Sequence, residues 1–98
     1  MALTAFAINC TLTPSPAESS CERLIAETLT ELERHGVTGE QIRAVDFNIK
    51  PGVTSDEGEG DDWPQLRQRI LDADIFILGS PVWLGHHSSV CQRVLERL

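Results

Sequence analysis

Two continuous apolar runs constrain the fold of this 98-residue chain more than any other feature of its sequence. Residues Leu3–Asn9 and Ile75–Leu78 consist almost entirely of aliphatic and aromatic side chains. They lack the polar alternation of a strand that has one face in water. Strands buried on both faces show this pattern, and they occur in parallel sheets that carry helices on both sides. The two runs therefore predict a parallel sheet.

The segment after the first run has the pattern of an amphipathic helix that ends near His35. Its apolar positions recur on one helical face and are Leu24, Ile25, Thr28, Leu29 and Leu32. Ser19 or Ser20 is suited to cap its start, and Gly36 can take the left-handed conformation that ends a helix. We therefore expect a helix between the first strand and the next.

The rest of the chain supplies one further strand and two further helices. Gln41–Phe47 is predicted as a strand, and Lys50–Asp62 as a glycine-rich acidic loop. A helix begins at Trp63-Pro64, because proline is favoured in the first helical turn. Its inner face is predicted to contain Leu66, Ile70, Leu71 and Ala73. A last helix from about Ser88 is predicted to bury Val90, Val94, Leu95 and Leu98.

The resulting order is β-α-β-α-β-α, without an internal repeat. Alternating strands and helices predict an α/β fold, in which right-handed crossovers place helices on both faces of an open parallel sheet. The chain is 41% hydrophobic and 23% charged, which is ordinary for one globular domain.

The loop after the first strand is a candidate phosphate site. Hydroxyl side chains line it from Thr11 to Ser20, and it leads into a helix N-terminus. Unpaired N–H groups and a partial positive charge make such a terminus favourable for a phosphate. The candidate hydroxyl donors are Thr11, Thr13, Ser15, Ser19 and Ser20. The alternative is that the two serines only cap the helix.

The turn after the third strand is a candidate wall for a flat aromatic ligand. Its residues are Ser80, Pro81, Val82, Trp83, Leu84 and Gly85. Loops at the carboxyl ends of strands are where open α/β sheets bind ligands. The alternative is that Trp83 packs into a hydrophobic corner or an interface.

Charge and cysteine content exclude several classes of function. The formal net charge of −7 argues against nucleic acid and anionic membranes, which require clustered lysine and arginine. No apolar run approaches the roughly 20 residues that span a bilayer, and the first residues lack the features of a signal peptide. Cys10, Cys21 and Cys91 form no zinc-binding pattern, so we expect reduced thiols and a cytoplasmic location.

Two further groups of polar residues favour structural interpretations. His86 and His87 are adjacent, so they cannot easily face one metal ion together, and we expect loop residues. The acidic stretch at 56–62 lacks the spacing of a calcium-binding EF-hand loop and is predicted to be a solvated loop. We predict no metal site.

Three motifs resemble the flavodoxin-like NAD(P)H-dependent FMN reductases: Gly79-Ser80-Pro81-Val82-Trp83-Leu84-Gly85, Lys50-Pro51-Gly52-Val53 and Asp61-Asp62-Trp63-Pro64. The resemblance implies that Thr11, Ser19 and Ser20 hold the FMN phosphate. It also implies that Pro81, Val82, Trp83, Leu84 and Gly85 border the flavin ring. NAD(P)H would supply electrons and a quinone or free flavin would accept them, with no catalytic side chain. Cys10-Thr11-Leu12-Thr13-Pro14 replaces the family's usual phosphate-loop sequence.

The resemblance also implies a three-layer α/β/α sheet of five parallel strands in the order 2-1-3-4-5. This chain contains the first three, so we expect the order 2-1-3 and interpret residues 1–98 as the N-terminal part of one flavodoxin-like domain. The third strand would then be an open apolar edge, which pairs readily with another chain. We therefore expect a homo-oligomer, in which the strand at residues 75–78 pairs with another copy or strands are exchanged between copies.

Three functions remain open from the sequence. The first is an FMN-binding NAD(P)H-dependent oxidoreductase of the flavin or quinone reductase type, of which this chain is a fragment. The second is a flavodoxin-type electron carrier without a substrate of its own. The third is an inactive fragment that has lost flavin binding.

Overall fold

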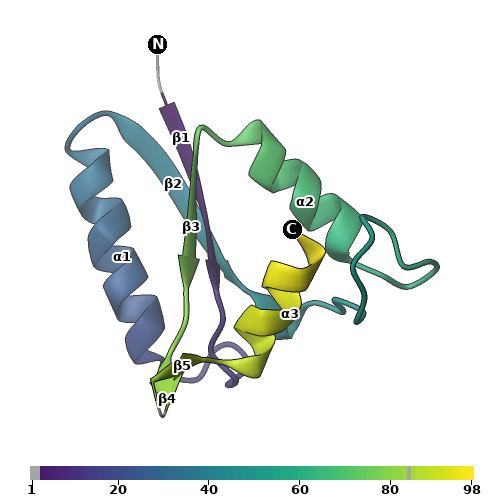
Figure 1. Cartoon of the computed structure of the whole chain (residues 1–98). Helices are drawn as coiled ribbons and strands as arrows, with labels where there is room; N and C mark the ends of the chain where they lie inside the picture. The colour runs from purple at the N-terminus through teal and green to yellow at the C-terminus, as the bar shows by residue number, and fades with distance from the viewer. Residues whose placement is uncertain (1–2, 84) are drawn as a thin grey trace.

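Three parallel strands form the centre of the computed structural model, which describes residues 3–83 and 85–98 (Figure 1). They are β1 (Leu3–Asn9), β2 (Val37–Arg43) and β3 (Ile75–Gly79), arranged in the order β2-β1-β3. β1 is paired along its whole length with β2 and from Ala5 onward with β3. The predicted strand order 2-1-3 is confirmed.

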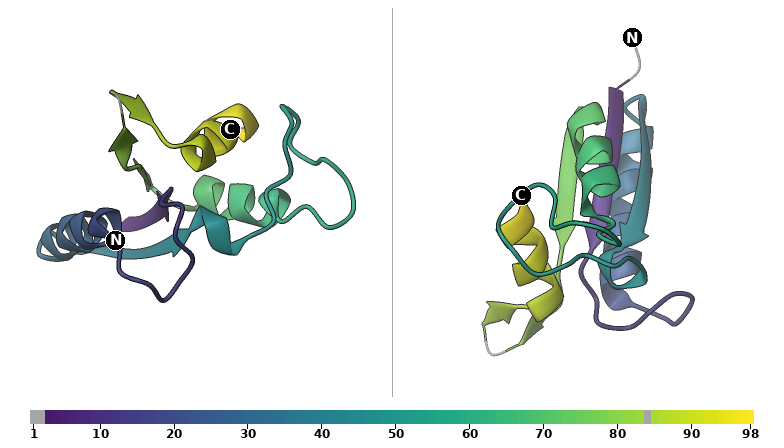
Figure 2. Two further views of the ribbon diagram at one scale, coloured as in Figure 1. Left: turned by 90° about the horizontal axis from the view of Figure 1, so that it is seen from below. Right: turned by 90° about the vertical axis from the view of Figure 1, so that its right-hand side faces the viewer.

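Helices cover both faces of this sheet. α1 (Ser20–Glu33) lies on one face, whereas α2 (Trp63–Asp72) and α3 (Ser89–Arg97) lie on the other (Figures 1 and 2). Three layers result, as the sequence predicted. No helix within the described part of the chain is long and apolar enough to cross a membrane.

The main core lies between the sheet and the pair α2 and α3. Phe6 and Ile8 of β1 point into it, because alternate residues of a strand face opposite sides of a sheet. Trp63 and Leu66 of α2 fill its centre and are 0% exposed. The other buried members are Cys10, Ala44, Ile49, Cys91 and Val94.

The face toward α1 is packed with small residues instead. A Cβ atom added to Gly39 would lie 2.6 Å from Leu29 Cδ2, and one added to Gly79 would lie 2.7 Å from Ile25 Cδ1. Both distances are too short for a side chain. The two glycines therefore allow α1 to lie directly against the sheet.

The predicted position of the second strand was wrong. Gln41–Phe47 was expected, but β2 is Val37–Arg43, and Ala44–Asp46 forms a short 3-10 helix. Residues 34–36 form the turn after α1, and Gly36, its last residue, has a φ of +82°, so β2 starts at the next residue. Gly39 lies within this strand, and Leu29 of α1 packs closely against it.

The predicted buried face of each helix was right in part, but it included residues that are exposed to solvent. Ile25, Leu66 and Val94 are buried as expected, and Ile70 and Val90 are partly buried. Four leucines predicted to face inward are exposed: Leu24, Leu71, Leu95 and Leu98. α3 buries every third residue instead, namely Cys91, Val94 and Arg97, and this row turns Leu95 toward solvent.

The turn after β3 is a small hairpin. Its strands are β4 (Val82–Trp83) and β5 (His86–His87), which pair antiparallel. Gly85 has a φ of +73°, a conformation that glycine adopts without strain. The predicted site residue Leu84 and the side chain of Trp83 lie outside the described part of the chain.

Candidate functional site

The carboxyl ends of β1 and β3 and the start of α3 are joined by hydrogen bonds. The backbone N–H of Cys10 donates to the Gly79 carbonyl at 2.7 Å. Ser88, the N-cap of α3, donates its hydroxyl to the Cys10 carbonyl at 2.7 Å. The loop after β1 and the hairpin after β3 therefore begin side by side at one edge of the sheet.

A cavity of about 300 Å³ lies where these two segments meet. It brings together four of the predicted cofactor ligands, because Thr11, Ser19 and Ser20 line one side and Pro81 lines another. Its other lining residues are Leu12, Thr13, Glu18 and Cys21. The carboxyl ends of parallel strands meet at the same edge, which is why residues 70 positions apart share this cavity.

Among the other predicted site residues that the structure describes, Ser80, Val82 and Gly85 are outside the lining of this cavity. Ser80 uses its hydroxyl internally, donating to the Pro81 carbonyl at 2.8 Å and accepting from the Ser88 N–H at 2.9 Å. Val82 is 66% exposed and Gly85 is exposed on the hairpin. Val82 and Gly85 follow Pro81 in the chain, so they are placed to border only a ligand that extends out of the cavity.

Ser19 both caps α1 and keeps a donor for an anion. Its Oγ accepts hydrogen bonds from the Glu22 N–H at 3.1 Å and from Asn9 Nδ2 at 3.3 Å. A hydroxyl that accepts twice retains its own proton to donate. Ser20 is exposed at the first turn of the same helix, beside the unpaired N–H groups there.

The donor set of the cavity fits a phosphate. Its hydroxyls, together with the positive end of the α1 dipole, supply hydrogen bonds to an anion without a cationic side chain in the lining. Glu18 is the one anionic residue in the lining, and it is exposed, so its carboxylate remains solvated. The arrangement can hold a phosphate group at the loop and an apolar surface against Pro81.

Residues that sequence reasoning missed hold the loop in place. Arg43 at the end of β2 donates to the carbonyls of Thr13 at 2.9 Å and Ala17 at 2.5 Å. Asp46 accepts from the backbone N–H of Ser15 at 3.0 Å and from its hydroxyl at 2.6 Å. These two bonds lower the pKa of the Asp46 carboxyl. A lone arginine at a strand end gives no local sign of burial, so the sequence offered no direct signal.

Cys10 is a buried core residue next to the candidate site. Its side chain is 0% exposed in the main core. Burial raises the pKa of the Cys10 thiol, and the neighbouring Cys91 and Cys21 raise it further. The thiol is therefore protonated at neutral pH, and a protonated thiol is a poor nucleophile.

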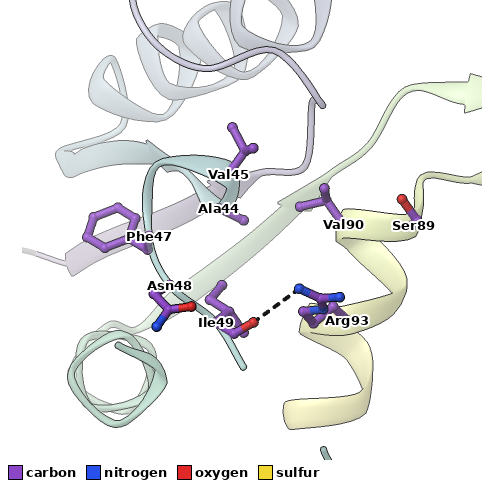
Figure 3. Close-up of a pocket in the computed structure, with 8 residues that line it drawn as sticks. All are labelled: Ala44, Val45, Phe47, Asn48, Ile49, Ser89, Val90 and Arg93. Atoms are coloured by element: carbon purple, nitrogen blue, oxygen red, sulfur yellow. Dashed lines mark hydrogen bonds between the residues drawn. The ribbon is translucent and has the colours of Figure 1, made fainter. Parts of the chain in front are cut away.

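A second cavity, of about 230 Å³, lies between residues 44–49 and α3 (Figure 3). Apolar side chains form much of its lining, and Arg93 reaches across it to the Ile49 carbonyl at 3.4 Å. Its lining residues are Ala44, Val45, Phe47, Asn48, Ile49, Ser89, Val90 and Arg93. Four of the predicted cofactor ligands line the other cavity, and the two cavities share no lining residue.

The two histidines form local hydrogen bonds. His87 Nε2 lies 2.5 Å from Gln92 Oε1, and His86 Nδ1 lies 3.0 Å from the His87 carbonyl oxygen. Within residues 3–83 and 85–98, no group of three or more histidine, cysteine, aspartate or glutamate side chains is arranged to hold a metal ion.

Comparison with protein families matches residues 5–98 to NADPH-dependent FMN reductase. The chain belongs to this family. The resemblance predicted from the hairpin and loop motifs is confirmed by the match, which extends over almost the whole length of the chain.

Curated relatives and a solved structure extend the comparison of this FMN reductase family member. The chain is 33% identical over 107 residues to 8-demethyl-8-aminoriboflavin-5'-phosphate synthase of Streptomyces davaonensis, covering 100% of this chain and 42% of that protein. It is 45% identical over 100 residues to the divalent metal cation transporter MntH of Mycobacterium bovis, covering 98% of this chain and 15% of that protein.

The crystal structure of RosB with the bound intermediate 8-demethyl-8-formylriboflavin-5'-phosphate superposes with a TM-score of 0.82 and 29% identity. This match covers 98% of the present chain and 42% of the RosB chain. The flavodoxin-like fold predicted from the sequence is thereby confirmed. The chain spans less than half the length of each of these proteins.

Proposed function

We propose that this chain is the phosphate-binding part of an FMN-binding NAD(P)H-dependent oxidoreductase of the flavin or quinone reductase type. The observation that carries this proposal is the cavity in which Thr11, Ser19, Ser20 and Pro81 meet at the carboxyl ends of β1 and β3. Membership of the FMN reductase family supports the same function. The named product of the Streptomyces synthase and the molecule bound in RosB are both riboflavin 5'-phosphates, which supports a flavin phosphate as the ligand.

In this proposal the residues of the chain bind and orient FMN, and none of them transfers a proton. Ser19 and Ser20 donate to the phosphate at the start of α1, and Thr11 adds a hydroxyl from the end of β1. Pro81 and the β4–β5 hairpin exclude water from one side of the ring. FMN, when bound, supplies the chemistry of hydride acceptance from NAD(P)H. We place this activity in the cytoplasm, because the three cysteines are free thiols.

We expect the chain to bind FMN more tightly than riboflavin, which lacks the phosphate. A helix N-terminus stabilises an anion by roughly 0.3–2 kcal/mol, which corresponds to a preference of about 2- to 30-fold. Titration that follows quenching of flavin fluorescence measures both affinities. Equal affinities would contradict the phosphate site, and no binding of either flavin would contradict the flavin function.

The acidic surface favours a second candidate, an electron carrier that docks on a basic redox partner. The net charge of −7 gives the long-range attraction that such docking uses. Oxidation of NADPH by the FMN-loaded chain, with a quinone as acceptor, separates the two functions. A reductase turns over continuously, whereas a carrier binds FMN and shows almost no turnover.

We further propose that β3 pairs with β3 of a second copy of this chain. All five residues of β3 are only half-buried, and none of them is charged. A two-fold axis at this edge would pair the two strands antiparallel and continue the sheet. Light scattering should show the mass doubling as the concentration rises into the high micromolar range.

Two lysine substitutions test this pairing, one in β3 and one, as the control, on α1. Ile75→Lys places a charge at the start of the edge strand and should keep the chain monomeric. Leu24→Lys places the same charge on α1, at a residue that is 65% exposed, and should leave the dimer unchanged. A wild-type chain that stays monomeric throughout the range would contradict the pairing.

A further inference from the structure

The loop between β1 and α1 is unusual for a phosphate loop because residues 11–19 contain no glycine. Glycine lets the backbone approach a phosphate closely in many such loops. Here the shape of the loop is imposed by side chains outside it. Those side chains come from the ends of β1 and β2 and from the short 3-10 helix that follows β2.

The contacts fall on every second residue of the loop. Asn9 bonds the Thr11 N–H at 3.0 Å and Ser19 Oγ at 3.3 Å, and so holds both ends. Arg43 bonds the carbonyls of Thr13 and Ala17, and Asp46 bonds Ser15 between them. Asn9 and Arg43 are direct neighbours in the β1–β2 ladder, so one pair of strand ends fixes the loop at four points.

From these contacts we propose that Arg43 is a positioning residue for the phosphate site. This inference rests on the proposed function. The Arg43 side chain is 3% exposed, and its two terminal nitrogens reach two carbonyls of the loop together with the carboxylate of Glu22, at 2.9 Å. Glu22 belongs to the first turn of α1, so Arg43 fixes the loop and the helix N-terminus relative to each other.

The geometry requires arginine and not merely a positive charge. The planar guanidinium presents its donors in a rigid fork, whereas lysine carries one compact ammonium. The Arg43 Nε is buried without a hydrogen-bond partner in the described part of the chain. The two terminal nitrogens thus make all the hydrogen bonds of this side chain, and the Nε donor is left unsatisfied.

The decisive experiment compares FMN with riboflavin in the Arg43→Lys variant of the full chain. A displaced loop should weaken FMN binding by about three- to tenfold and leave riboflavin binding unchanged, so the preference for FMN shrinks toward one. The matched control is Arg69→Lys, because Arg69 also pairs with a carboxylate, Glu40 at 2.7 Å, but lies away from the loop. That variant should keep the wild-type preference.

Amide hydrogen exchange of the unliganded chain gives a readout that does not depend on flavin. In Arg43→Lys the amides of residues 11–17 should exchange faster than in wild type, while those of β1 keep their protection. Unchanged loop exchange, or equal weakening of FMN and riboflavin binding, would overturn the inference. Failure of the wild-type chain to bind either flavin would overturn the proposed function instead. Faster loop exchange in Arg43→Lys would then still support the inference that Arg43 positions the loop.

Discussion

Replacing Asp61 by asparagine should lower the free energy of unfolding by about 3–5 kcal/mol, because it leaves a buried arginine without its counter-charge. The side chains of Asp61 and Arg97 are each 0% exposed, with Oδ2 of the aspartate 2.5 Å from an arginine nitrogen. A domain of this size has a stability of about 5–15 kcal/mol. The substitution should therefore remove a large part of it.

The remaining contacts of this pair explain why the cost is high. Asp61 also accepts backbone N–H bonds from Lys50, Glu57 and Trp63. Arg97 also donates to the carbonyl oxygens of Lys50 at 2.7 Å and of Thr54 at 2.9 Å. One ion pair thus attaches the acidic loop before α2 to the last turn of α3, and its loss frees both.

Urea denaturation followed by circular dichroism measures the effect of Asp61→Asn. Glu31→Gln is the matched control, because Glu31 pairs with Arg34 on the surface, where the two side chains are 62% and 73% exposed. Exposed pairs contribute about 0–1 kcal/mol, so the control should unfold almost like wild type. Equal midpoints for the two variants would contradict a stabilising role of the buried pair.

The same pair predicts a dependence of stability on acid. Hydrogen bonds from Arg97 hold the pKa of the Asp61 carboxyl well below its usual range. A carboxyl whose pKa is lower in the folded state than in the unfolded state contributes stability above its unfolded pKa of about 3.9. That contribution should be lost progressively as the pH falls below about 4, and Asp61→Asn should abolish this part of the acid dependence.

Replacing Trp63 by alanine should lower the free energy of unfolding by about 3–5 kcal/mol. Trp63 is 0% exposed and is the largest fully buried side chain among the described residues. The Arg97 guanidinium lies 5.8 Å from its ring, so the substitution also removes a cation–π contact from the buried ion pair. Thermal unfolding followed by calorimetry measures the loss.

Trp63→Phe should be much less harmful than Trp63→Ala, at less than about 2 kcal/mol. Trp63 Nε1 is buried without a hydrogen-bond partner in the described ranges, and phenylalanine removes this unsatisfied donor while it keeps an aromatic ring. Leu71→Ala on the same helix is the control, since Leu71 is 58% exposed. A phenylalanine variant as unstable as the alanine variant would contradict this account of the core.

The topology was predictable because it depends on local patterns. The apolar runs of β1 and β3 and the helical repeats between them are written in short stretches of sequence, and parallel pairing follows from their order. The position of β2 was not predictable in the same way. Gly39 lies inside that strand because Leu29 of α1 comes too close for a side chain there, and a contact between distant segments leaves no local pattern.

The candidate site was predictable only where topology alone decides it. Thr11, Ser19, Ser20 and Pro81 meet because the carboxyl ends of β1 and β3 are adjacent. Val82 and Gly85 were expected beside them, but β4 and β5 pair with each other and carry these residues toward solvent. Arg43 and Arg97 were overlooked because arginine is normally a surface residue, and their burial depends on carbonyl groups far away in sequence.

The bond from Ser88 to the Cys10 carbonyl has a consequence for the order in which the chain folds. It joins residues that are 78 positions apart, whereas β1 and β2 are joined by a single helix. The entropy lost in closing a loop grows with its length, so β1, α1 and β2 have the lower barrier to assembly. We therefore expect the loop between β1 and α1 to form with this unit, and Pro81 to join it when β3 docks. The two sides of one cavity are thus expected to form at different stages of folding.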